Sequence, residues 1–296
     1  MREYDYVVVG HLTVDELWSD AGVKLRLGGA ASYGSVFASG LGLSSVVVTK
    51  VGEDFPQQYT EYLRSMGVDL SGLARSQHPT TRFRIFLREA SVVASMVCRS
   101  APILAADIAH FRGKVIHLGP VAGEIPSETV FQARENSEVL ALDLQGILRE
   151  FGASGELKLN PARLEPLRGI SLVAHANWSE AVAATGIGEP VLSAKILMKT
   201  FGLAAVTMGA DGAIVAGHEG TLRVGAVKLQ DSVDDVGAGD VFTAALAVAL
   251  AEGDSLREAS KFASASAGAS TLFQGPSKIP KGLIWDLETR VDVSWI

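Results

Sequence analysis

The sequence predicts an α/β fold in which helices cover both faces of a mostly parallel central sheet, with a small β-sheet lid added. Short, continuous apolar runs alternate with helical segments, which is typical of parallel strands buried on both faces. Two antiparallel segments, at about residues 12–27 and 80–99, interrupt that alternation early in the chain. No linker, repeat or low-complexity tract divides the 296 residues. We therefore expect one domain over residues 1–296, built as a three-layer α/β/α sandwich.

The first half of the chain supplies both lid segments. The apolar run 7–9 predicts a buried strand that Gly10 closes, and residues 12–27 predict a hairpin that turns near residues 20–22. Residues 82–98 alternate apolar and polar side chains and predict a second, exposed antiparallel pair. Between these segments we expect a helix over 32–41, a strand at 46–48, and a helix over 59–66 that ends before Gly67.

The second half of the chain alternates between strands and helices. Strands are predicted at residues 115–118, 139–144, 172–174 and 204–207. A helix is predicted over 127–136 with Ser127 as its N-cap. The stretch 241–251, the longest uncharged and mostly apolar one, is far too short to span a membrane.

Composition and charge exclude several classes of protein. The 26 Lys and Arg residues against 33 Asp and Glu residues give a net charge of −7, which argues against a general binder of nucleic acid or anionic membranes. Cys98 is the single cysteine, which excludes a disulfide framework and a thiolate zinc site. The histidines lack metal-ligand spacing, and the N-terminus lacks the pattern of a signal peptide. We therefore expect a cytoplasmic protein.

A glycine-rich segment near the C-terminus gives the strongest local signal. Gly237 and Gly239 expose backbone at the start of an alanine-rich helix, where free N–H groups and the helix dipole favour an anion. Asp240 follows in the first turn, where we expect the helix terminus to keep it ionised. A carboxylate there would repel a phosphate, so it suits the removal of a proton from an incoming hydroxyl group. Tight helix packing explains these residues equally well, and the segment lacks the third glycine of a dinucleotide-binding motif.

A second glycine cluster, residues 28–35, follows the hairpin and precedes a helix. Gly28 and Gly29 would let a small ligand approach the backbone closely. Asp15 lies just beyond the first strand, where parallel sheets place ligand contacts, and a short carboxylate suits the paired hydroxyl groups of a sugar or polyol. For Asp15 taken alone, a purely structural role in shaping the hairpin explains the residue equally well.

The order of these motifs resembles the ribokinase-like, or PfkB, family of small-molecule kinases over essentially the whole chain. Four landmarks stand in the family's order: residues 10–15, Gly28-Gly29, Asn177-Trp178-Ser179-Glu180 and Gly237-Ala238-Gly239-Asp240. A fifth, residues 207–212, is similar to the turn that borders the family's nucleotide site. Each landmark is weak alone, whereas the ordered set is specific.

The resemblance implies a role for each matching position. Asp240 would be the catalytic base, and the amides of Gly237, Ala238 and Gly239 would form the anion hole. Substrate contacts would come from Asp15, Gly28, Gly29, Tyr33 and Arg149, and nucleotide or phosphate contacts from Asn177, Thr207, Gly209 and Gly212. Glu180 would hold Mg²⁺ through water, and Asp234 matches a position near a monovalent-cation site, which implies K⁺.

Departures from the family pattern bear on the substrate. Tyr33 stands where the family often has Asn, and its ring would form an apolar wall against a ring-shaped substrate. Asp235-Val236 stand where the family often has Thr-Thr. Residues 29–33 and 142–146, together with Arg149, are most similar to the branch that contains inositol and nucleoside kinases. Arg149 would reach a substrate oxygen or a phosphate, although a solvated arginine after a strand also fits.

The resemblance implies transfer of the γ-phosphoryl group of ATP to a hydroxyl group of a sugar or polyol of the inositol type. A nucleoside kinase of the same fold and a non-catalytic sugar or nucleotide sensor are the alternatives. The lid would close over the substrate and exclude water. Because such an exposed sheet has edges and an apolar face to cover, we expect a homodimer that forms through the lid.

Overall fold

A ten-stranded sheet forms the centre of the computed structural model, which describes residues 2–19, 22–88, 91–152, 154–227, 229 and 231–296. In spatial order its strands are β16 (Val293–Trp295), β15 (Gly220–Val224), β14 (Ala213–Gly217), β13 (Gly202–Thr207), β12 (Leu172–Asn177), β9 (Ser137–Asp143), β8 (Phe111–Leu118), β1 (Arg2–Val9), β4 (Ser45–Gly52) and β5 (Asp69–Ser76). The strands from β13 to β5 run parallel, whereas β14, β15 and β16 are antiparallel at one edge. The predicted, mostly parallel sheet is confirmed.

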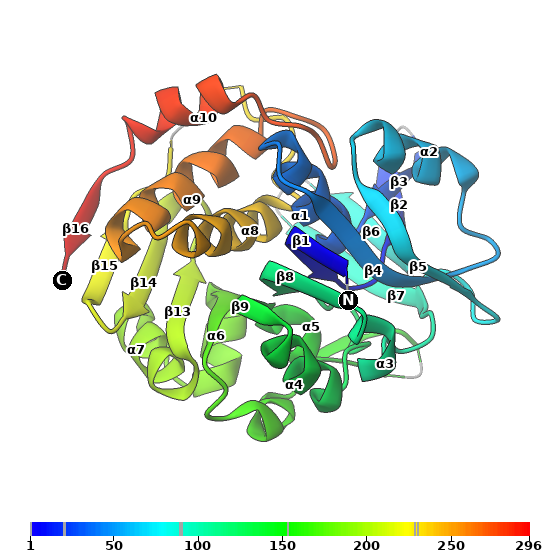
Figure 1. The fold of residues 1–296 in the computed structure, drawn as a ribbon, viewed down its shortest axis with the longest axis horizontal. Helices are drawn as coiled ribbons and strands as arrows, with labels where there is room; N and C mark the ends of the chain where they lie inside the picture. Colours follow the sequence, from blue (N-terminus) through cyan, green and yellow to red (C-terminus); the bar gives the residue numbers. More distant parts are fainter. Residues whose placement is uncertain (1, 20–21, 89–90, 153, 228, 230) are drawn as a thin grey trace.

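Two helical layers cover this sheet, one on each face (Figure 1). One layer contains α1 (Ala30–Gly40), α2 (Gln57–Ser65), α8 (Ala238–Ala251), α9 (Leu256–Ser270) and α10 (Lys281–Glu288). The other contains α3 (Ala105–Ile108), α4 (Ser127–Glu135), α5 (Leu144–Leu148), α6 (Trp178–Thr185) and α7 (Pro190–Phe201). Alternate side chains of β1 pack against the two helical layers. Tyr6 and Val8 lie in one buried cluster, and Val7 and Val9 lie in the other.

Several short elements complete the described structure. Two 3-10 helices span Pro161–Leu167 and Gly209–Asp211, and β10 (Arg149–Phe151) pairs with β11 (Leu157–Leu159). Within the ranges described, no single helix is long and apolar enough to cross a membrane. Helices α6 and α7 pass that test of length and composition only as a pair, and they are bent by 63° relative to each other.

The predicted lid is a separate four-stranded sheet at the edge of the molecule (Figure 1). Its strands are β3 (Gly22–Gly28), β2 (Thr13–Ser19), β6 (Arg82–Arg88) and β7 (Ser91–Cys98), in that spatial order. Each predicted antiparallel pair is present, and β2 joins the two pairs by running parallel to β6. The predicted turn at residues 20–22 falls partly on residues 20–21, which lie outside the described ranges.

The structure corrects the sequence analysis at two kinds of position. Ser127 is wrong as the N-cap of α4: Pro126 holds that position, without a side-chain cap, and the Ser127 hydroxyl donates to Glu128 instead. Proline is suited to the position at which the chain enters a helix, because the backbone φ of proline is already restricted. Strands β5, β10, β11, β14, β15 and β16 were not predicted. Most of them have short or mixed sequences without the continuous apolar runs of the central strands, whereas β14 is a buried apolar run that was not recognised as a strand.

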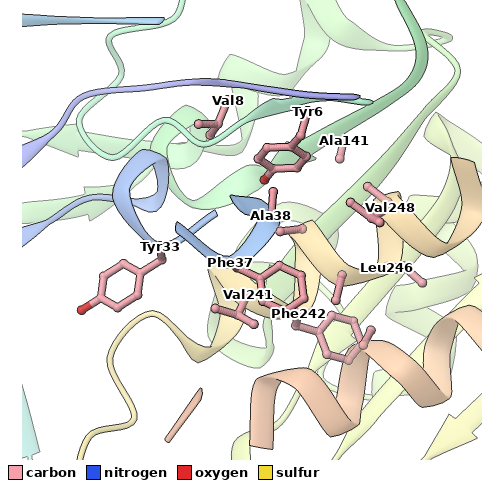
Figure 2. Close-up of a cluster of buried hydrophobic side chains, with 14 of the residues drawn as sticks. Tyr6, Val8, Tyr33, Phe37, Ala38, Ala141, Val241, Phe242, Leu246 and Val248 are labelled. Carbon is pink, nitrogen blue, oxygen red and sulfur yellow. The ribbon is translucent and has the colours of Figure 1, made fainter. Parts of the chain in front are cut away.

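Helix α8 lies deep in its layer and is apolar on all sides apart from Asp240 and Thr243 near its start. Val241, Phe242 and Leu246 of α8 share a buried cluster with Phe37 of α1 (Figure 2). A helix that is apolar all round is held by burial rather than by its intrinsic propensity. This packing places the N-terminus of α8, at Gly237, beside the carboxyl ends of the parallel strands, where the main cavity opens.

Candidate active site

A cavity of about 890 Å³ lies between the lid, the carboxyl ends of the parallel strands and the start of α8. The predicted site residues that line it are Asp15, Gly29, Tyr33, Arg149, Asn177, Glu180, Thr207, Gly209, Gly212, Gly237, Ala238, Gly239 and Asp240. Gly28 and Asp234 are the predicted residues that do not line it. Residues that the sequence separates by more than two hundred positions therefore meet in one space.

Gly237 is the N-cap of α8, and its backbone conformation requires glycine. Its φ is 85°, in the left-handed region that side chains rarely adopt, and a Cβ atom there would overlap the Tyr33 ring. The Ala238 amide makes a long hydrogen bond of 3.3 Å to the carbonyl oxygen of Asp235. Since the first amides of a helix lack acceptors within the helix, this end of α8 can bind an anion.

Asp240 lies in the first turn of α8, with its carboxylate in the cavity. The Gln145 side-chain amide donates a hydrogen bond of 3.3 Å to Asp240 Oδ1. Burial raises the pKa of Asp240 well above its ordinary range, and the negative charge of nearby Asp143 raises it further, against an opposing effect of Arg149. This direction is opposite to the expected effect of the helix terminus, because desolvation outweighs the dipole. Asp240 therefore holds a proton more tightly than an exposed aspartate does.

Asp15 forms the lid side of the cavity. It lies on β2 and is almost fully buried, and the Thr13 hydroxyl donates to its Oδ1 over 2.8 Å. Burial raises the pKa of Asp15 to about 6, against the effects of the Thr13 hydrogen bond, Arg26 and Arg149. A Cβ atom at Gly28 would overlap the Asp15 carboxylate, so Gly28 makes room for this side chain instead of lining the cavity.

Tyr33 and Arg149 form further parts of the wall. The ring of Tyr33 projects from α1, and its hydroxyl group points away from the Phe37–Phe242 cluster (Figure 2). That hydroxyl is buried and has no hydrogen-bond partner in the described part of the chain. Arg149 donates from Nη1 to the carbonyl oxygen of Val121 over 3.2 Å, and its charge lowers the pKa of both Asp15 and Asp240. Arg149 is thus held by the wall and acts electrostatically on both carboxylates.

Asn177 and Glu180 form a reciprocal capping box at the start of α6. The Asn177 side chain accepts from the Glu180 amide, and the Glu180 carboxylate accepts from the Asn177 amide, both over 3.0 Å. The motif therefore has a structural role as a helix cap, and its functional role stays a prediction. Glu180 is buried at the cavity wall and uses Oε2 for this bond. Within the described ranges, no group of three or more His, Cys, Asp or Glu side chains is arranged to hold a metal.

The far end of the cavity is less polar. Thr207, Gly209 and Gly212 border it at the turn between β13 and β14. Beyond them the wall is formed by small and apolar residues of the loop after β15 and of α9, namely Ala226, Val227, Leu229, Ser264, Ala267 and Gly268. A flat apolar ring fits such a wall better than a charged group does.

A buried polar chain below the cavity was missed by the sequence analysis. It joins one residue from each of five neighbouring strands, in the order Tyr6, His117, Asp143, His175 and Thr207, with contacts of 2.6, 2.7, 2.8 and 3.1 Å. The two histidines lower the pKa of Asp143, in spite of its burial. His175 also lines the cavity and stacks on Phe242 of α8. The one available sequence signal was that Asp143 and His175 both lie near strand ends.

Asp234 precedes the glycine segment but binds the lid. The Arg26 guanidinium of β3 donates from Nη1 to Asp234 Oδ2 over 2.7 Å. This contact crosses from the lid to the loop that leads into α8. The carboxylate expected near a monovalent cation therefore already has a positively charged partner.

Comparisons with known proteins identify the family of this chain. A model of the pfkB family carbohydrate kinases matches residues 1–281. The cytidine kinase of Thermococcus kodakarensis is 25% identical over 264 residues, which cover 86% of this chain and 91% of that protein. The inositol 3-kinase of Arabidopsis thaliana is 28% identical over 256 residues, which cover 83% of this chain and 68% of that protein.

Solved structures share the fold along nearly the whole chain. A pyrophosphate-dependent kinase in the ribokinase family, in complex with sulfate, superposes with a TM-score of 0.79 at 23% identity, covering 92% of this chain and 96% of that one. The ribokinase of Arabidopsis thaliana, complexed with ribose and ATP, superposes with a TM-score of 0.73 at 19% identity, covering 97% and 99%. At these identities the structures establish the ribokinase fold.

Proposed function

The chain belongs to the pfkB family of carbohydrate kinases, which are phosphotransferases with hydroxyl acceptors, and we propose that it phosphorylates a sugar or polyol of the inositol type with ATP. The observation that carries this proposal is that one cavity holds Asp240, the anion-binding start of α8 and Asp15. A hydroxyl-bearing substrate held by Asp15 would lie on the lid side of that cavity. A phosphate bound at the helix start would lie within reach of the same substrate.

In this proposal Asp240 accepts the proton of the attacking hydroxyl group. The raised pKa makes the ionised form of this carboxylate a stronger base toward the hydroxyl proton. The amides at Gly237, Ala238 and Gly239 stabilise negative charge on the transferring group. Because the transition state of phosphoryl transfer carries much charge and little new bonding, positioning and electrostatics supply most of the catalysis.

The donor site in this proposal extends from the start of α8 to the apolar far end of the cavity. The small residues of α9 and the loop after β15 suit an adenine ring, which supports ATP as the donor. Glu180 and Asn177 also line this cavity, and Glu180 suits a hydrated Mg²⁺ because its carboxylate keeps an oxygen beyond the one in the capping box. Bound Mg²⁺ would neutralise charge on the donor phosphates.

Two acceptor classes fit the cavity. The inositol 3-kinase relative favours a polyol, whose paired hydroxyl groups suit the short carboxylate of Asp15. The cytidine kinase relative favours a nucleoside, and the apolar side chains of Tyr33, Phe83 and Ile85 provide a surface on which a base would pack. Asp15 suits the paired hydroxyl groups of a polyol and equally those of a nucleoside's ribose, so it does not separate the two classes. We favour the polyol on the inositol 3-kinase relative, which is 28% identical to this chain.

A panel of acceptors and donors tests the proposal. The acceptors are myo-inositol, ribose, fructose, cytidine and adenosine, and the donors are ATP, GTP, ADP and pyrophosphate, since a fold neighbour uses pyrophosphate. Products are identified by phosphorus NMR and mass spectrometry, so that every donor is read in the same way. Phosphorylated inositol supports the proposal, and phosphorylated cytidine with no inositol product supports the nucleoside alternative. Ligand-induced thermal shifts without any phosphorylated product would identify a sensor.

The outer face of the lid is proposed as a homodimer interface. Asp15 and Arg26 face the cavity side of the lid sheet, so the alternating residues Trp18, Val23 and Leu25 project from the opposite side. These three side chains are 37%, 47% and 54% exposed. A second copy of the same sheet would cover this apolar face and the free edge of β3. Sedimentation that finds only monomer at micromolar concentration would remove this proposal.

A further inference from the structure

The ion pair between Arg26 and Asp234 joins the lid to the loop that precedes the anion-binding helix. Arg26 lies on β3, and Asp234 lies three residues before Gly237. Their side chains are 12% and 9% exposed, and Nη1 and Oδ2 are 2.7 Å apart. At such low exposure the pair is weakly screened by solvent and salt. Removal of one partner would leave the other charge buried without compensation.

Both oxygens of the Asp234 carboxylate are already engaged. Besides Arg26, the Gly275 amide donates to Oδ2 over 3.1 Å, and the Val236 amide donates to Oδ1 over 3.1 Å. The Asp234 amide in turn donates to the carbonyl oxygen of Thr271 over 3.1 Å. The expected monovalent cation does not fit at this carboxylate, because hydrogen-bond donors reach both oxygens and a guanidinium ion supplies the positive charge.

Arg26 also lies beside the substrate side of the cavity. In the β2–β3 register, Arg26 stands directly opposite Asp15, and its charge lowers the pKa of Asp15 and of Tyr33. The same side chain therefore acts on the residue proposed to hold the acceptor and on the loop that carries Gly237. Among the described residues, the Arg26–Asp234 ion pair directly connects β3, next to Asp15, with the loop that carries Gly237.

We propose that Arg26 is a positioning residue that serves as a tethered cation for the anion-binding loop, so that the enzyme needs no free monovalent cation. The ion pair fixes residues 234–237 and holds β3 of the lid against them at the same time. This inference rests on the proposed kinase function for its kinetic test, and a second test below is independent of that function.

The kinetic test measures initial rates in potassium, sodium and tetramethylammonium chloride at equal ionic strength. The wild-type protein should show rates within twofold of each other. Arg26→Met, which keeps an unbranched side chain but is shorter and carries no charge, should lower kcat at least tenfold in tetramethylammonium, and potassium should restore part of that loss. Arg26→Lys should retain more activity than Arg26→Met. The matched control is Arg84→Gln, since Arg84 is a lid arginine that pairs with Glu16 on the outer face.

The results overturn the inference if wild type is stimulated tenfold by potassium, or if Arg26→Met retains full kcat without it. A purely structural role for Arg26 would lower the amount of folded protein without creating a dependence on potassium. The independent test is hydrogen exchange of the β2 and β3 amides in the unliganded protein. Arg26→Met and Asp234→Asn should each speed this exchange at least tenfold, and the double variant should add little to either. Unchanged exchange in both variants contradicts the coupling even if no acceptor substrate is found.

Discussion

The Thr243 hydroxyl donates a hydrogen bond of 2.6 Å to Oδ1 of Asp143, which ties helix α8 to the carboxyl end of β9. Thr243 lies one turn beyond Gly239, whose carbonyl oxygen is 3.1 Å from the same hydroxyl oxygen. The other oxygen of Asp143 pairs with His117, which in turn contacts Tyr6 of β1. The start of α8 is therefore held by polar contacts below it as well as by the apolar packing along its length.

We expect Thr243→Val to loosen this attachment. The substitution keeps the shape of the side chain and leaves the buried Asp143 carboxylate with one donor fewer, which should lower the free energy of unfolding by about 1–2 kcal/mol. Because α8 carries Asp240, kcat should fall several-fold, while the KM for the donor changes less. Thr243→Ser keeps the hydroxyl group and should stay near wild type in urea denaturation and in initial rates. Equal behaviour of the valine and serine variants would show that this hydrogen bond does not position the helix.

Asp240→Asn should remove the proposed base and leave the cavity intact. We expect kcat to fall by about 10²–10⁴-fold, the range typical of general base catalysis, because the amide cannot accept the hydroxyl proton. Donor binding, measured by calorimetry with ADP, should stay the same or strengthen, since a negative charge near the phosphates is lost. Glu252→Gln at the exposed C-terminal end of α8 is the control for a carboxylate on the same helix. Turnover within tenfold of wild type would refute the assignment of Asp240 as the base.

Asp15 should make the protein less stable as the pH rises from about 4 to about 6. Its pKa is raised from 3.8 to about 6 in the folded protein, so the folded state binds the proton more tightly than the unfolded state does. The folded state therefore gains stability at low pH and loses it as Asp15 ionises, by on the order of 3 kcal/mol in total for an isolated group.

Asp15→Asn tests this assignment, because the amide does not ionise. The variant should be more stable than wild type at pH 7, and this advantage should shrink as the pH is lowered to 4, as measured by urea denaturation at each pH. The same variant should raise the KM for the acceptor, since the carboxylate proposed to accept hydrogen bonds from its hydroxyl groups is lost. A difference in stability that is constant across this pH range would exclude Asp15 as the titrating group.

Those parts of the candidate site that depend on local geometry could be predicted from the sequence. Gly237 and Asp240 could be predicted because a glycine turn, a helix start and a first-turn carboxylate stand next to one another in the chain. The chain from Tyr6 to Thr207 could not, because it depends on the spatial order of five strands, which apolar runs do not specify. The Arg26–Asp234 pair was missed for the same reason, since 208 positions separate its partners. The effect of burial on the pKa of Asp240 was also missed, because desolvation depends on the packed structure.

Glu180→Gln separates the two roles of the Asn177–Glu180 motif. Glutamine can still accept the Asn177 amide hydrogen bond, so the capping box and the fold should remain, whereas the charge that would attract a hydrated Mg²⁺ is lost. We expect the Mg²⁺ concentration for half-maximal rate to rise about tenfold, with kcat at saturating Mg²⁺ reduced much less. The matched control is Glu258→Gln, because Glu258 forms the same kind of capping box with Ser255 at the exposed start of α9. If both variants leave the Mg²⁺ titration unchanged, Glu180 acts only as a helix cap, and the metal must be held by the donor phosphates and other residues.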